Sequence, residues 1–132
     1  MKSLRMDGQT GIDWVDEQHR DLQDVIDRAV IMILERTEKE EVMGKLDEFL
    51  STWERHCQSE EAHINKINSP RITVMQSEHE RVKMRFAKLK GYYVENPDIF
   101  QDSTALFELR NLLIKHVIDF DVIELRNPHP AK

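Results

Sequence analysis

The sequence predicts an all-α fold, an up-down-up-down four-helix bundle with an N-terminal arm. Four segments place apolar residues at intervals of three and four, which is the spacing of one helix face. The 132 residues include only four Gly and four Pro, a composition that favours helix over strand. Because the links between segments are short, neighbouring helices should run antiparallel. We expect one domain over residues 1–132, with the arm at about 1–12 and the bundle at about 13–126.

The first two helices are marked by possible N-caps followed by apolar faces. The first helix should begin near Asp13 or Asp16, either of which can serve as its N-cap. Its inner face contains His19, Leu22, Ile26, Ala29 and Ile33. The second helix follows the capping-box pattern Thr37-x-x-Glu40. Its inner face contains Leu46, Phe49, Trp53, His56, Glu60, Ile64 and Ile67.

The third and fourth helices are separated by a clear break. Ser69-Pro70 predicts an N-cap followed by a first-turn proline. The apolar face of this third helix is Ile72, Met75, His79, Val82, Phe86, Leu89 and Tyr93. Asn96-Pro97 marks the break, and the fourth helix should begin near Asp102 or Ser103. Its face is Leu106, Leu109, Leu113, His116, Phe120 and Ile123.

Histidine and carboxylate side chains interrupt all four apolar faces. In an up-down bundle, the first and third helices begin at the end where the second and fourth helices finish. The interruptions all lie within about ten residues, on the order of 15 Å, of that shared end. They are His19, His56, Glu60, His79, His116 and Asp121. The topology therefore predicts that they form one cluster.

The composition of this cluster indicates a metal site. Burial of imidazole and carboxylate groups is costly unless a partner compensates for it, as a metal ion does. His56 and Glu60 are four residues apart, so both leave their helix on one face. Asp121 follows His116 by five residues, about 140° around a regular helix, so spacing alone does not pair them. Four imidazoles and two bridging carboxylates suit two ions of iron, manganese or zinc.

Other functional classes receive no support from the composition. The net charge is -6, and no basic cluster indicates a nucleic-acid partner. Cys57 is the only cysteine, so no internal disulfide forms, and we interpret it as a packing residue. No signal peptide or membrane span of about 20 apolar residues is evident, so we expect a cytoplasmic protein without membrane contact. Glu61, Glu78 and Glu80 should lie on solvated faces.

The chain carries an ordered set of short motifs. They are Gly11-Ile12-Asp13, Asp16-Glu17-Gln18-His19, His56-x-x-x-Glu60-Glu61, Pro70 through His79, and His116-x-x-x-x-Asp121. In this order and spacing, the set resembles a hemerythrin-type domain, in particular a single-domain bacteriohemerythrin, over nearly the whole chain. The resemblance implies two non-haem iron ions bridged by carboxylates and an oxo or hydroxo group. The implied ligands are His19 with His56 for one iron, His79 with His116 for the other, and Glu60 with Asp121 as bridges.

One position departs from the family pattern. The resemblance implies a third histidine on the second iron, and Met75 stands at that position. A thioether is a soft ligand that suits such an iron site poorly, so we do not expect Met75 to coordinate. The site should then be more open than in the family. His63 is a possible substitute ligand, although a half-exposed histidine near a helix end is the favoured interpretation.

The resemblance implies binding of O2, for storage, transport or O2 and redox sensing, rather than an enzyme. Related small ligands are NO, peroxide and azide, and the sequence specifies no protein partner. The more open site keeps oxidase-like or peroxidase-like redox activity as an alternative. A metal-free helical interaction module is another. Haem held by Met75 and His116 is disfavoured, because it would leave the two carboxylates without a role. We expect an apolar wall near the site from Leu22, Trp53, Ile64 and Phe120.

Overall fold

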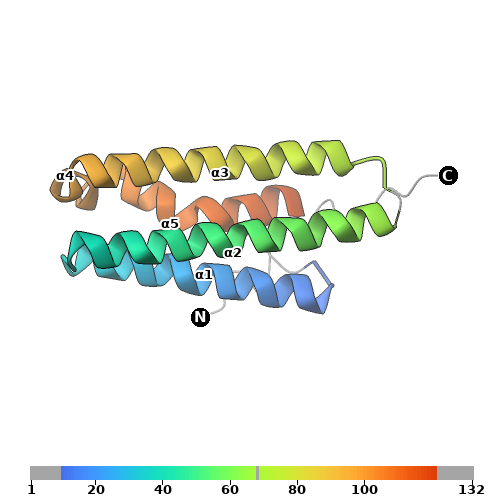
Figure 1. Cartoon of the computed structure of the whole chain (residues 1–132), viewed down its shortest axis with the longest axis horizontal. Helices are drawn as coiled ribbons and strands as arrows, with labels where there is room; N and C mark the ends of the chain where they lie inside the picture. The colour runs from blue at the N-terminus through green and yellow to red at the C-terminus, as the bar shows by residue number, and fades with distance from the viewer. Residues whose placement is uncertain (1–9, 68, 122–132) are drawn as a thin grey trace.

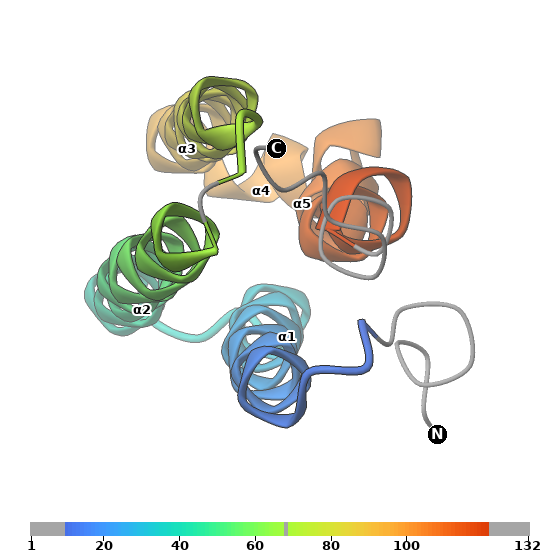
Figure 2. The same cartoon turned by 90° about the vertical axis from the view of Figure 1, so that its right-hand side faces the viewer.

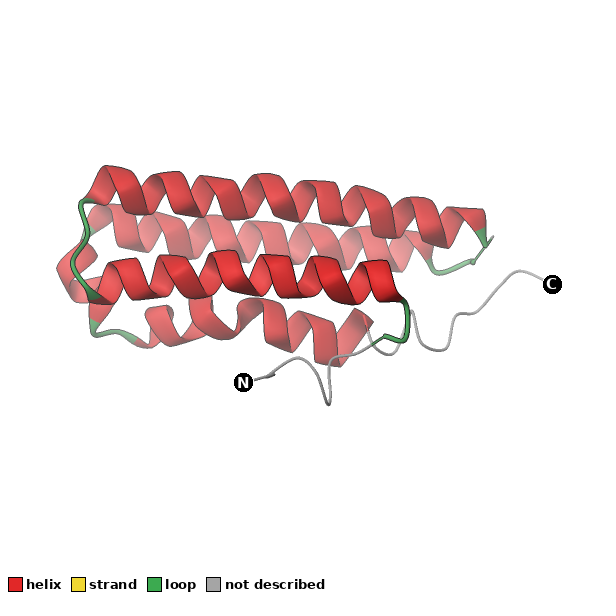
Figure 3. Ribbon diagram, turned by 90° about the horizontal axis from the view of Figure 1, so that it is seen from below, coloured by secondary structure: helices red, strands yellow, loops and turns green. Residues whose placement is uncertain are grey.

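The computed structural model describes residues 10–67 and 69–121, and it confirms the all-α class (Figure 3). The helices are α1 (Asp13–Leu34), α2 (Lys39–Lys66), α3 (Ile72–Glu95), α4 (Pro97–Gln101), α5 (Thr104–His116) and the π-helical turn η1 (Val117–Asp121). No strand occurs among the described residues. None of the described helices is both long and apolar enough to span a lipid bilayer.

The four long helices α1, α2, α3 and α5 run side by side with alternating direction (Figure 1). Seen along the bundle, they occupy the corners of a square (Figure 2). Both α1 and α3 pack against α2 and against α5. This is the predicted up-down-up-down arrangement, and it brings the start of α1 and α3 to the same end as the close of α2 and α5.

The main apolar core fills the length of the bundle away from that end. The rings of Phe49 and Phe86 lie 4.8 Å apart between α2 and α3. Its largest fully buried members from all four helices are Leu22, Ile26, Leu46, Phe49, Trp53, Phe86, Leu89, Leu109 and Leu113. Every one of them belongs to a predicted inner face, so the helical periodicity identified the core correctly.

The N-caps of α1 and α2 differ from the sequence prediction, although α1 starts where it was expected. Although α1 begins at Asp13, its N-cap is Ile12, and no side chain caps it. The Asp16 carboxylate instead accepts hydrogen bonds from the backbone N–H and the hydroxyl of Thr10, at 2.8 and 2.9 Å. The predicted capping box at Thr37 is also wrong, because α2 has Glu38 as its N-cap. The N–H of Thr37 bonds back to Met32 and closes the end of α1.

The remaining helix ends show one further error and one success. Ser69 does not cap α3, which begins at Ile72; its hydroxyl accepts from the N–H of Arg71 in the preceding turn, at 3.2 Å. Ser103 is the N-cap of α5 as predicted, and its hydroxyl accepts from Ala105 at 3.2 Å. Asn96 is the N-cap of the short helix α4, which was not expected. Ile123 and the predicted end of the bundle near residue 126 lie outside the described residues.

Candidate metal centre

Six polar side chains meet inside the bundle at the end where α1 and α3 begin. Each has an exposed fraction of at most 4%. They are the six residues that the sequence singled out: His19 from α1, His56 and Glu60 from α2, His79 from α3, His116 from α5 and Asp121 from η1. Every long helix therefore contributes at least one of them to a single buried cluster.

The cluster divides into two overlapping groups of four. Within each group, one atom per residue lies within 4.8 Å of the others. The groups are His19 and His56 with Glu60 and Asp121, and His79 and His116 with the same two carboxylates. Each pair of histidines thus has access to both acidic side chains. Such an arrangement is suited to two cations that share two bridging carboxylates.

The distances around Glu60 and Asp121 agree with this division. One oxygen of Glu60 lies 3.0 Å from Nε2 of His56, and the other lies 2.9 Å from Nε2 of His79. Oδ2 of Asp121 lies 3.0 Å from Nε2 of both His19 and His116. Two atoms that bind one cation at about 2.1 Å and at right angles are about 3 Å apart. The donor atoms therefore already have the mutual spacing of neighbouring ligands.

Several polar atoms of the cluster have no hydrogen-bond partner among the described residues. Four of them are His56 Nε2, Glu60 Oε2, His116 Nε2 and Asp121 Oδ1. These atoms are not isolated, since His56 Nε2 lies 3.0 Å from Glu60 Oε2 and His116 Nε2 lies 3.0 Å from Oδ2 of Asp121, but none of the four makes a hydrogen bond of regular geometry. Cations between the helices would satisfy them. The residues present therefore fit a metal centre.

The π-helical turn η1 explains how His116 and Asp121 come together. A regular α-helix would turn the side chain five residues later about 140° away. A π-helix closes its hydrogen bonds five residues apart instead of four, which returns that side chain to the same side. In η1, Val117–Asp121, this extra residue in the turn brings Asp121 within 3.0 Å of His116. The five-residue spacing is therefore compatible with one site.

Comparison with known proteins supports the interpretation of this cluster as a metal centre. Residues 10–119 match the family model described as the hemerythrin HHE cation binding domain. The chain belongs to this hemerythrin family. Searches of curated proteins and of solved structures gave no match. The matched segment contains five of the six donor residues, and Asp121 lies just beyond it. In this hemerythrin-family chain, Asp121 is therefore placed in the cluster by its distances to His19 and His116, and not by the family match.

Three of the four histidines are held by an acceptor from the preceding long helix of the bundle. The acceptor bonds the Nδ1 atom and leaves Nε2 directed into the cluster, which fixes the ring orientation as in known metal sites. The pairs are Gln18 with His56 at 2.7 Å, Glu61 with His79 at 2.8 Å and Glu78 with His116 at 2.8 Å. Nδ1 of His19 has no partner among the described residues.

These acceptors were missed by the sequence analysis. Glu61 and Glu78 were expected on solvated faces, and this is wrong, because both are partly buried and bonded to histidine. Each acceptor is adjacent in sequence to a donor residue of its own helix, with Gln18 before His19 as the third case. A polar residue next to a predicted ligand, at the boundary of the apolar face, was the available signal.

The apolar surroundings of the cluster include two aromatic side chains. The ring of Trp53 lies 5.2–5.7 Å from the rings of His56, His79 and His116. Phe120 stacks on His116 with ring centres 5.8 Å apart. The other two residues of the expected wall, Leu22 and Ile64, are buried. Both aromatic rings thus pack against histidines of the cluster.

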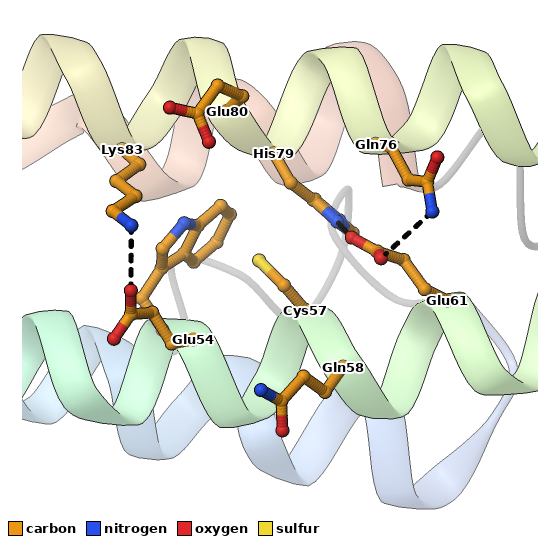
Figure 4. A pocket seen from close by; sticks show the side chains of 9 residues that line it. Glu54, Cys57, Gln58, Glu61, Gln76, His79, Glu80 and Lys83 are labelled. Atoms are coloured by element: carbon orange, nitrogen blue, oxygen red, sulfur yellow. Dashed lines mark hydrogen bonds and ion pairs between the residues drawn. The ribbon is translucent and has the colours of Figure 1, made fainter.

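A surface groove of about 400 Å³ between α2 and α3 lies beside the centre (Figure 4). It is lined by Trp53, Glu54, Cys57, Gln58, Glu61, Gln76, His79, Glu80 and Lys83. Glu61 lies between His79 and Gln76, and Glu54 pairs with Lys83 at 2.8 Å. Cys57 is buried beside the core, as expected for a packing residue, and this burial raises the pKa of its thiol.

His63 does not belong to either donor group, and Met75 lies among apolar side chains. Met75 is buried in an apolar cluster with Val15 and Ile64. His63 is half-buried, and its ring meets the edge of Trp14 at 5.8 Å. That the thioether of Met75 is not a ligand stays a prediction for the metal-bound protein.

Charged neighbours within the cluster shift the pKa values of its members in the direction opposite to the effect of burial. Burial lowers the pKa of His56 and of His116, but the nearby carboxylates outweigh it and raise these values to about 9 and about 10. Burial and the charge of Asp121 raise the pKa of Glu60, but the histidine cations outweigh them and lower it to about 2. Without metal at neutral pH, His56 and His116 therefore carry protons that an incoming cation must displace.

Proposed function

We propose that the chain holds two iron ions at this centre and binds O2 or a related small ligand such as NO, peroxide or azide. The supporting observation is the pair of donor groups, each with two histidines, that share Glu60 and Asp121. His19 and His56 would hold one ion, and His79 and His116 the other. Two ferrous ions in this position would supply two electrons to the bound ligand. Storage, transport and O2 or redox sensing all fit this chemistry, in a cytoplasmic setting.

The residues around the donors would control the site in two ways. Gln18, Glu61 and Glu78 orient three imidazole rings through Nδ1, so that each Nε2 is directed inward before any metal arrives. Trp53 and Phe120 cover the rings on the apolar side and keep bulk water away. Limited water access would slow the oxidation of the ferrous centre.

The absorption spectrum and the iron content of the purified protein test this proposal together. Metal-free protein is loaded with ferrous iron without air, its iron per chain is measured, and air is then admitted. We expect two iron ions per chain and a new visible absorption on contact with O2. A haem Soret band in the protein as first purified would instead support haem ligation. Failure to take up metal would favour the helical interaction module.

A redox activity is the second candidate, and Met75 is the observation that favours it. Each ion would have two histidines and shared carboxylates, so both ions would keep a position open to external ligands. Two open positions favour oxidase-like or peroxidase-like turnover over reversible binding.

The substitution Met75→His separates these two functions. A histidine at this position would supply the missing ligand to the second ion, so we expect the oxygenated protein to last longer before it oxidises. Stopped-flow absorption measures this lifetime, and Met75→Leu is the control for altered packing. An unchanged lifetime in Met75→His would show that the missing ligand does not govern oxidation.

A further inference from the structure

An apolar layer lies one helical turn from the candidate centre, at the end of the bundle. Its buried members are Val15, Ile64 and Met75. Partly buried residues packed against them are Ile12, Trp14, Ile67, Ile72 and Phe120. Val15 precedes His19 by four residues, Ile64 follows Glu60 by four, and Met75 precedes His79 by four. One helical turn rises about 5.4 Å, so the layer lies about that far along the helices from the donor residues, toward the end of the bundle.

Met75 is the oxidisable sulfur of this layer, and the fold shields it from solvent. Its exposed fraction is 1%, whereas Met84, nine residues later on the same helix, is 64% exposed. Peroxides convert a methionine thioether to the sulfoxide, and an oxidant in solution attacks the accessible sulfur first. Selective oxidation of Met75 therefore requires an oxidant that forms inside the bundle.

We infer that Met75 is an internal oxidation site that records reaction of the centre with O2; this rests on the proposed function. With ferrous iron in the centre, O2 would take up two electrons, one from each ion, and two protons, and would become hydrogen peroxide. The O–O bond of the peroxide then breaks as one oxygen forms an S–O bond with Met75. The other oxygen leaves as water, and the thioether has lost two electrons. No reactant beyond O2, protons and the ferrous ions is needed.

The sulfoxide would change the layer that closes this end of the bundle. It is polar, whereas Val15, Ile64 and the ring of Phe120 around Met75 are apolar. Packing beside the centre would loosen, and access of small molecules to the donors would increase. Oxidation of Met75 would thus alter how small molecules reach the centre.

The test compares two methionines within one protein. Iron-loaded, reduced protein is exposed to air in the presence of catalase, which removes peroxide from solution, and sulfoxide is mapped by tandem mass spectrometry. We expect a mass gain of about 16 Da at Met75, at least about tenfold more often than at Met84. Metal-free protein treated with hydrogen peroxide should show the reverse order.

Two matched variants complete the experiment. Met75→Leu keeps the apolar volume of the side chain and should lose the mass gain, whereas Met84→Leu should retain it. Preferential oxidation of Met84, Trp53 or Cys57 in the iron-loaded protein would overturn the inference. The iron content of the same sample distinguishes the two failures. Bound iron with intact Met75 contradicts only this inference, whereas absence of iron contradicts the proposed function as well.

Discussion

Glu60 and Asp121 determine the centre at the scale of single residues, because each lies within 4 Å of histidines from three helices. Their negative charges hold protons on His56 and His116 until a cation replaces them. The acceptors Gln18, Glu61 and Glu78 then decide in which direction each ring presents its second nitrogen. Donors and acceptors together form one network, so a change in either should alter metal affinity.

Removal of one acceptor should weaken metal binding without removing any ligand. In Glu78→Ala, His116 loses the partner at its Nδ1, and we expect iron affinity to fall about 10- to 100-fold. The matched control is Glu80→Ala, since Glu80 is an exposed carboxylate on the same helix that bonds no histidine in the described structure. Competition titration with a coloured chelator measures both. Equal affinities would show that Glu78 does not orient His116.

The stability of the metal-free protein should depend on pH through the same residues. The pKa of His56 is raised from 6.5 to about 9 and that of His116 from 6.5 to about 10. Their contribution is complete below pH 6.5 and is lost as pH rises through 9 to 10. The pKa of Glu60 is lowered from 4.5 to about 2, so its contribution is complete above pH 4.5 and is lost as pH falls through 2.

We therefore expect maximal stability of the metal-free protein between about pH 4.5 and 6.5. Urea midpoints at pH 5.5, 8 and 9.5 should decrease in that order. Iron-loaded protein is the control, since bound cations replace the protons and should remove much of the alkaline decline. A midpoint for the metal-free protein that stays constant up to pH 10 would be inconsistent with these raised pKa values.

The donor histidines could be predicted from the sequence because each interrupts an apolar face that helical periodicity already defines. The acceptors could not be predicted in the same way, because Glu61 and Glu78 are of a residue type that is usual on solvated helix faces. Their roles depend on how close the neighbouring helix approaches. That distance is a property of tertiary packing and leaves only a faint trace in a single sequence.

Helix ends and the turn η1 show the limits of local sequence rules at the scale of elements. Ser103 caps α5 as its type and position predict. Thr37 does not cap α2, because its backbone is used to close α1 through a bond to Met32. The π-helical turn could not be predicted from spacing, since a regular helix would separate His116 from Asp121. The irregular turn brings Asp121 into the centre, which a regular helix would not do.

A pair of cap variants tests the assignment of helix ends. Ser103→Ala removes the hydroxyl that accepts from Ala105, and we expect the free energy of unfolding to fall by about 1 kcal/mol. Thr37→Ala removes a hydroxyl that caps no helix and should change it by less than about 0.5 kcal/mol. Urea unfolding of the metal-free protein measures both values. A larger loss for Thr37→Ala would reinstate the capping box.

At the scale of the whole molecule, the apolar core that stabilises the bundle and the polar cluster of the candidate centre lie in different parts of the up-down bundle. The main apolar core occupies the length of the bundle, and the polar cluster lies near the end where α1 and α3 begin. This separation followed from the sequence, because four amphipathic segments with short links admit few arrangements. The same topology provides donors from every long helix at one depth. It also places the apolar layer of Val15, Ile64 and Met75 beyond them.

The central claim is that two cations lie between the histidine pairs and share Glu60 and Asp121. Anomalous scattering from crystals of the iron-loaded protein, measured at the iron absorption edge, tests it most directly. The account predicts two anomalous peaks, one about 2 Å from Nε2 of His19 and His56 and one about 2 Å from Nε2 of His79 and His116. A single peak, or peaks away from both carboxylates, would contradict it.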